Sequence, residues 1–103
     1  MRIEDFNERL KQAILVADGA MGSLLYESVG PQRCVDELNV THSDAVFHVH
    51  QTYIEAGAQI IETNTFSANR HKLGQFGMAE RVAELNHRAV KSPARRARPR
   101  NTK

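Results

Sequence analysis

The chain has 103 residues, of which 41% are hydrophobic and 25% are charged, and its formal net charge is +2. This length suits one small domain with one core, and the composition is ordinary for a soluble protein. No apolar run approaches the roughly 20 residues that span a bilayer, so no membrane partner is expected.

The first residues and the cysteine content favour a cytoplasmic protein. The start, MRIEDFNERL, alternates in charge sign and lacks the apolar core of a signal peptide. The single cysteine, Cys34, cannot form an internal disulfide, which fits a reducing compartment. We therefore expect a cytoplasmic location.

The basic charge is concentrated at the C-terminal end of the chain. Residues 92–103 hold five basic residues and no acid, namely Arg95, Arg96, Arg98, Arg100 and Lys103. Without these five, nine basic residues stand against twelve acids, so residues 1–91 carry a formal charge of −3. The composition of residues 92–103 predicts a basic, disordered tail. No nucleic acid is expected as a partner, apart from weak phosphate contacts by this tail.

The N-terminal part predicts a helix, a strand and a second helix. One apolar stripe at helical spacing marks an amphipathic helix, formed by Ile3, Phe6 and Leu10. Residues 13–17 are a continuous apolar run, which suits a strand buried on both faces of a parallel sheet. Residues 23–30 predict a turn or two of helix that ends at Gly30.

The central and C-terminal parts predict two more helices around a second strand. Residues 31–42 look irregular, and Thr41 with Asp44 resembles a capping box, although Ser43 competes as the N-cap. A helix then follows with Gly57 expected at its C-terminal end. The apolar pair at 60–61 predicts a strand, and residues 82–89 predict the last helix. The apolar stripes of the two helices are Val46, Val49 and Tyr53, and Val82, Leu85 and Ala89.

Alternating helices and strands predict an α/β fold with parallel strands joined by a right-handed crossover. Both predicted strands end in polar residues, with Asp18-Gly19 after the first and Glu62-Thr63-Asn64 after the second. Because parallel strands end at the same edge of a sheet, these groups are expected to meet. Carboxylates suit an ammonium, and N–H or hydroxyl donors suit a carboxylate, so the edge could bind an amino acid.

Each of these residues also has an ordinary structural explanation. An Asp-Gly pair at a strand end is commonly a turn former. Thr63 and Thr65 could satisfy loop backbone groups, and Glu62 could be solvated. The residue types alone leave both interpretations open.

No metal site is predicted from the residue spacing. His48 and His50 stand two positions apart, so on a helix their side chains point about 200° apart. Cys34 has no nearby cysteine or paired histidine, and is expected to be a small buried apolar residue.

Three stretches resemble the start of the homocysteine S-methyltransferase domain. They are ILVADGAMGSLLY, CVDELNVTHSDAVFHVHQTYIEAGAQIIETNTFSANRHKLGQFGM and VAELNHRAVK, and the likeness covers about residues 5–91. Within the family, the chain looks most like the bacterial bifunctional homocysteine S-methyltransferase/methylenetetrahydrofolate reductases and the first module of methionine synthase. The most specific element is IETNTFSAN.

This resemblance implies the N-terminal part of a (β/α)8 TIM barrel over residues 1–91, about two parallel strands with flanking helices. In the family, a zinc ion binds the homocysteine thiol as thiolate and presents it to a methyl donor, which gives methionine. Methyltetrahydrofolate and cobalamin are both open as the donor. The residues that match the family's homocysteine contacts are Asp18, Gly19, Glu62, Thr63 and Phe66, and Asn64 lies in the same motif.

The chain also departs from the family pattern. The family's zinc ligands are cysteines from later strands, and Cys34 does not match any of them. Where the family helix continues past residue 91, this chain has Pro93, which is expected to disrupt the helix. We therefore expect a truncated methyltransferase domain that is inactive alone. The alternative is a non-catalytic remnant or interaction fragment with a basic tail.

Overall fold

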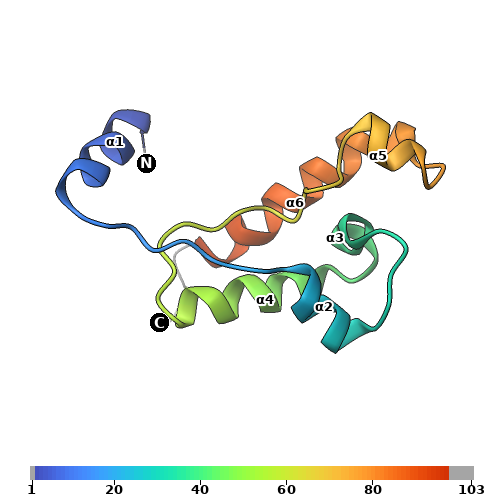
Figure 1. Ribbon diagram of the computed structural model, residues 1–103, viewed down its shortest axis with the longest axis horizontal. Coiled ribbons are helices and arrows are strands. Elements are labelled where there is room, and N and C mark those ends of the chain that lie inside the picture. Colours follow the sequence, from blue (N-terminus) through green and yellow to red (C-terminus); the bar gives the residue numbers. More distant parts are fainter. Residues whose placement is uncertain (1, 98–103) are drawn as a thin grey trace.

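The computed structural model describes the backbone of residues 2–97 and the side chains of residues 2–93 (Figure 1). The described part is mostly helical. Its α-helices are α1 (Ile3–Gln12), α2 (Gly22–Val29), α3 (Leu38–Thr41), α4 (Ser43–Glu55), α5 (Arg70–Gly74) and α6 (Val82–Ala97). Two short 3-10 helices, η1 (Val35–Glu37) and η2 (Ala79–Arg81), precede α3 and α6. No helix in the described part is long and apolar enough to cross a membrane.

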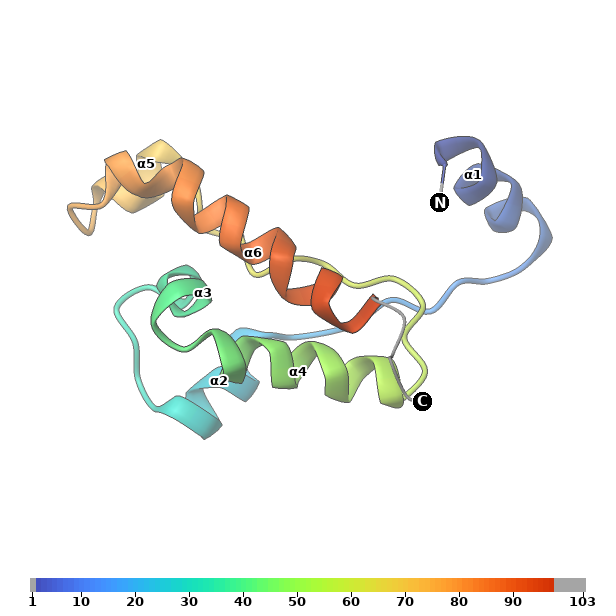
Figure 2. The same cartoon turned by 180° about the vertical axis from the view of Figure 1, so that it is seen from behind.

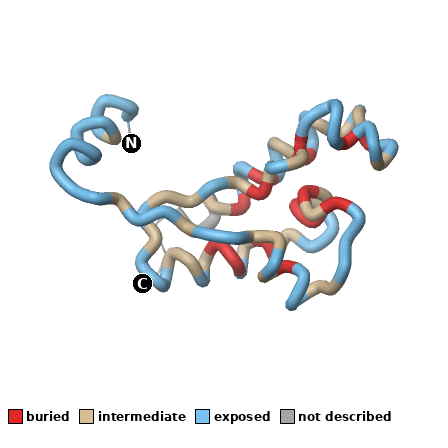
Figure 3. The backbone as a smooth tube through the Cα atoms, viewed as in Figure 1, coloured by how far each residue is buried: buried red, intermediate tan, exposed pale blue. Residues whose placement is uncertain are grey.

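Helices α4 and α6 pack side by side, while α1 stands apart at the end of an extended segment (Figures 1 and 2). No residue of α1 is buried. The buried residues gather on α2, α3, α4 and α6 and on the segments next to them (Figure 3). The apolar stripe predicted for residues 3–10 therefore forms a helix without packing against the body.

Two apolar clusters form the core of the described part. The first joins α2, α3 and α4 and contains Leu25, Leu38, Val46 and Val49. The second joins the loop before η1 to α5 and α6 and contains Cys34, Leu73, Met78 and Leu85. Cys34 is thus a buried apolar residue, as predicted, and both clusters lie on the helical side of the molecule.

The two predicted strands do not form within the described residues, which are mostly helical. One parallel bridge joins Ala17 to Ile60. The Gln59 and Ile60 N–H groups donate to the Val16 carbonyl at 2.6 and 3.1 Å. The predicted parallel direction and pairing are therefore present in one bridge only.

The burial predicted for residues 13–17 is also wrong. Ile14 is 91% exposed and Val16 is 53% exposed. A buried parallel strand needs neighbours on both edges and helices on both faces. Among the described residues, each bridged segment pairs only with the other, and the two apolar clusters lie elsewhere.

The helix ends agree with the sequence in one place and differ in another. Gly57 follows the C-cap of α4, Ala56, with φ of 112°, and the N–H of Ala58 donates to the Tyr53 carbonyl, as in a Schellman motif. The predicted capping box at Thr41 is wrong, because His42 is the N-cap of α4 and makes no side-chain cap. The Thr41 hydroxyl instead donates to the Glu37 carbonyl at 3.3 Å.

Two further predictions about local structure are corrected, and one helix was missed. Residues 31–42 are not irregular throughout, because they contain η1 and α3. Helix α5, whose N-cap Asn69 accepts from the Lys72 N–H at 2.8 Å, was not predicted. Helix α6 continues through Pro93 to Ala97, so Pro93 does not end it. The rest of the predicted tail, residues 98–103, lies outside the described residues, and its disorder stays a prediction.

Candidate functional site

The ends of the two bridged segments are tied together by the side chain of Asp18. Its Oδ2 accepts a hydrogen bond from the Glu62 N–H at 3.1 Å, and its own N–H donates to the Ile60 carbonyl at 2.9 Å. These residues are 44 positions apart in the chain. The meeting of the two polar segments was predicted from the parallel pairing, and it occurs although the strands themselves do not form.

A cleft of about 470 Å³ opens beside this junction, and we call it the Asp18 cleft. It is lined by the loop after Ala17, the loop before η1 and the segment from Glu62 to Ser67. All six predicted site residues line it: Asp18, Gly19, Glu62, Thr63, Asn64 and Phe66. The structure therefore brings the predicted residues to one place, while their binding role stays a prediction.

Gly19 is held close to a tyrosine from α4. The Tyr53 hydroxyl donates to the Ala20 carbonyl at 2.6 Å. A Cβ atom on Gly19 would lie 3.1 Å from the same hydroxyl oxygen. A side chain at position 19 would therefore displace Tyr53 or the loop, and glycine leaves the backbone of the cleft accessible.

Of the side chains in the second segment, two are exposed and two threonines are partly buried. Glu62 is exposed, and Phe66 is 90% exposed. The Thr63 and Thr65 hydroxyls share a hydrogen bond of 2.8 Å, and the Thr65 N–H donates to the Thr63 carbonyl at 2.9 Å. The threonines thus satisfy part of the loop, as the ordinary structural interpretation held, and the Glu62 carboxylate remains open to a ligand.

Asn64 positions the segment by buried hydrogen bonds. Its side-chain amide donates to the Val35 carbonyl at 3.0 Å and to Asn39 Oδ1 at 3.3 Å. The Asn39 amide in turn donates to the Asn64 carbonyl at 2.8 Å. Both asparagines are almost fully buried. The amide nitrogen of Asn64 is therefore engaged in fixing the loop.

Asp36 is a further acid of the cleft that sequence reasoning did not identify. It is buried, and its Oδ2 accepts a hydrogen bond from the Ser67 N–H at 2.9 Å. Burial raises the pKa of this carboxyl, and the Ser67 N–H opposes the rise. Its position in a segment read as irregular carried no local signal, because the partner is 31 residues away.

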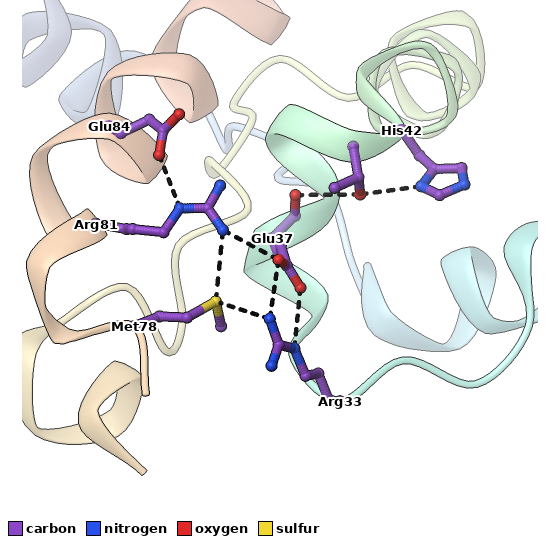
Figure 4. Close-up of polar contacts among 7 residues, drawn as sticks. Arg33, Glu37, His42, Met78, Arg81 and Glu84 are labelled. Carbon is purple, nitrogen blue, oxygen red and sulfur yellow. Dashed lines mark hydrogen bonds and ion pairs between the residues drawn. The ribbon is translucent and has the colours of Figure 1, made fainter. Parts of the chain in front are cut away.

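A network of four charged residues braces the loop before η1 against α6 (Figure 4). Glu37 accepts from Arg33 Nε and Nη2, both at 3.2 Å, and from Arg81 Nη1 at 3.0 Å. Arg81 Nε also donates to Glu84 at 2.8 Å. The hydrogen bonds from Arg33, reinforced by Arg81, lower the pKa of Glu37 below its usual value. Arg33 precedes η1 and lies only four residues from Glu37, whereas Arg81 is 44 residues from Glu37.

The described residues do not fit a zinc site. Among them, no group of three histidine, cysteine, aspartate or glutamate side chains lies close enough to hold a metal ion. Cys34 belongs to the second apolar cluster, and His48 is exposed on α4. His50 is fully buried, and neither ring nitrogen has a partner within the described part of the chain. No chemical step is therefore assigned to a metal on these residues.

Comparison with known proteins gives the family of this chain. The model of the homocysteine S-methyltransferase family matches residues 15–103. Methionine synthase of Mycobacterium leprae is 37% identical over 93 residues, and that of Mycobacterium tuberculosis is 36% identical over 93 residues. Each alignment covers 84% of this chain and 8% of the relative, so the chain spans about a twelfth of the relatives' length. The chain belongs to the homocysteine S-methyltransferase family.

Proposed function

We propose that the Asp18 cleft binds the amino-acid end of homocysteine, and that the chain supplies this substrate-binding part of a methyltransferase that forms methionine. The observation that carries the proposal is the convergence of all six predicted residues on one cleft. The family match gives the substrate class. In such an enzyme the two segments would be the ends of neighbouring strands of a (β/α)8 barrel, with residues 1–91 as its first part.

The chemistry of the cleft suits the ammonium group of an amino acid. Asp18 and Glu62 lie at the same junction and bring two carboxylates to one wall. The Glu62 N–H occupies one oxygen of Asp18, which fixes the direction of that carboxylate. Charge-assisted hydrogen bonds of this kind are roughly twice as strong as neutral ones. The group that activates the thiol is assigned to no described residue.

The Glu62→Gln variant tests this proposal. The side chain of Glu62 is exposed, so the substitution removes a charge without opening the core. Homocysteine binding, followed by NMR of the backbone amides in a reducing buffer, is expected to weaken about tenfold, because one charge-assisted contact is lost. The matched control is Glu27→Gln, an exposed acid on α2 outside the cleft, which is expected to bind like the unmodified chain.

A second ligand separates recognition of the ammonium group from a general effect. Mercaptobutanoate has the thiol and carboxylate of homocysteine and lacks the amino group. Its affinity is expected to be the same in the unmodified chain and in Glu62→Gln. The proposal is wrong if homocysteine does not perturb amides at residues 18–22 and 62–67, or if Glu27→Gln weakens binding as much as Glu62→Gln.

A further inference from the structure

The Asp18 cleft carries both signs of charge, and its cation comes from a single residue. Asp18, Asp36 and Glu62 supply its acids. Among the described residues that line the cleft, Arg33 is the only basic one. A ligand with one ammonium and one carboxylate would therefore find two acids at the Asp18 junction and one guanidinium in the loop before η1.

The guanidinium of Arg33 is held in a fixed direction, and its partners leave some of its N–H donors free. Glu37 binds its Nε and Nη2 atoms, and the Met78 sulfur contacts the same Nη2 at 3.5 Å (Figure 4). Its Nη1 amino group has no hydrogen-bond partner in the part of the chain that the structure describes. Arginine has five N–H donors, so two of them stay available on this atom.

Glu37 is shared between two arginines, because it also binds Arg81 at 3.0 Å. Its single negative charge therefore does not cancel the positive charge of Arg33. The side chain of Arg33 is 58% exposed, whereas that of Glu37 is 19% exposed. The charged group that a ligand can reach is therefore the guanidinium, and the acid stands behind it. Because Glu37 already holds the Arg33 side chain, Arg33 loses less rotamer freedom when a ligand binds, which favours binding.

We propose that Arg33 binds the α-carboxylate of the amino-acid ligand, through Nη1, while the acids of the cleft bind its ammonium group. This inference rests on the proposed function, since it names a residue for the second charged group of the same ligand. Nη1 carries two N–H donors and part of the guanidinium charge, so its hydrogen bond to a carboxylate is charge-assisted. This contact with the α-carboxylate makes Arg33 a determinant of specificity for amino acids over simple amines and thiols.

The test compares homocysteine with aminopropanethiol, which is the same molecule without the carboxylate. In Arg33→Gln, homocysteine affinity is expected to fall about tenfold or more, because a charged hydrogen bond is lost. Aminopropanethiol affinity is expected to stay within about twofold, since its ammonium contacts are intact. Arg33→Lys keeps the charge and is expected to recover part of the homocysteine affinity. Binding is measured by backbone-amide NMR, which also reports whether each variant is folded.

The control is Arg88→Gln, which removes an exposed arginine of α6 outside the cleft. It is expected to bind both ligands like the unmodified chain. Equal weakening of both ligands in Arg33→Gln, or no weakening of homocysteine, overturns the role of Arg33 and leaves the proposed function standing. If the unmodified chain binds neither ligand, both proposals fall.

Discussion

At the scale of single residues, the structure places buried polar groups where the sequence showed only helix. His50 lies on α4, fully buried, without a hydrogen-bond partner for either ring nitrogen among the described residues. Burial lowers its pKa from the ordinary value of 6.5, and the negative charge of Asp18 acts in the opposite direction. Two positions away, His48 is exposed. The two histidines share a helix and differ in burial.

The buried histidine predicts a pH dependence of stability. Because the pKa of His50 is lower in the folded state, the unfolded chain takes up the proton first as the pH falls through about 6.5. The free energy of unfolding is therefore expected to drop between about pH 7.5 and pH 5.5. In His50→Leu this part of the drop is expected to disappear, whereas His48→Leu should keep it. Urea unfolding at both pH values measures the free energy of unfolding. An equal drop between the two pH values in all three proteins would contradict the prediction.

At the scale of elements, α6 differs most from what its residues predict. Pro93 lies inside the helix and has no N–H to donate to the carbonyl of Ala89, four residues earlier. Leu85 and Ala89 are fully buried on the same helix. Packing of this apolar face offsets the proline, because tertiary contacts contribute more to helix stability than local propensity does.

Replacing the proline is expected to stabilise α6. Pro93→Ala restores the missing donor and removes the steric conflict, so the free energy of unfolding should rise by about 1 to 3 kcal/mol. Helical content measured by circular dichroism should rise as well. The control is Pro31→Ala, an exposed position outside the helices, which should give no gain. If Pro93→Ala leaves the free energy of unfolding unchanged, α6 does not extend through residue 93 in solution.

At the scale of the whole molecule, the apolar residues divide into a helical core and an exposed remainder. Leu25 and Leu38 are fully buried in the first cluster, whereas Ile14 and Phe66 are 91% and 90% exposed. Ile14 belongs to a bridged segment and Phe66 to the wall of the Asp18 cleft, and further exposed apolar side chains lie on α1, α2 and α6. Stability within the described part therefore resides in the helices, and the bridged segments add little buried area.

This division predicts a large effect on stability for one substitution that shortens an aliphatic side chain and almost none for another. Leu25→Ala removes fully buried atoms and is expected to cost about 2 to 5 kcal/mol of unfolding free energy. Ile14→Ala is expected to leave that energy within about 0.5 kcal/mol and to reduce self-association, since exposed apolar strand edges promote pairing between chains. Urea unfolding and sedimentation at several concentrations test both. A large loss of stability in Ile14→Ala would show that residues 13–17 are buried in solution.

The sequence by itself determined where the main helices lie and which two segments carry the polar site. Val46 with Val49 on α4 and Leu85 with Ala89 on α6 are buried as their spacing predicted, because a helical stripe is a local pattern. The convergence of Asp18 with Glu62 followed from the parallel direction of two short apolar runs. The family could also be read from motifs, since these are written in consecutive residues.

Only the tertiary structure decided which groups surround the site and how far the strands extend. Asp36 meets Ser67 across 31 residues, and Arg33 meets Met78 across 45. Such contacts depend on how distant segments pack, which no local pattern encodes. A β-ladder likewise needs neighbours on its edges, so two apolar runs produced one bridge. The hydrogen bonds of the buried Asn64 amide likewise depend on tertiary packing, because its partners Val35 and Asn39 come from another part of the chain.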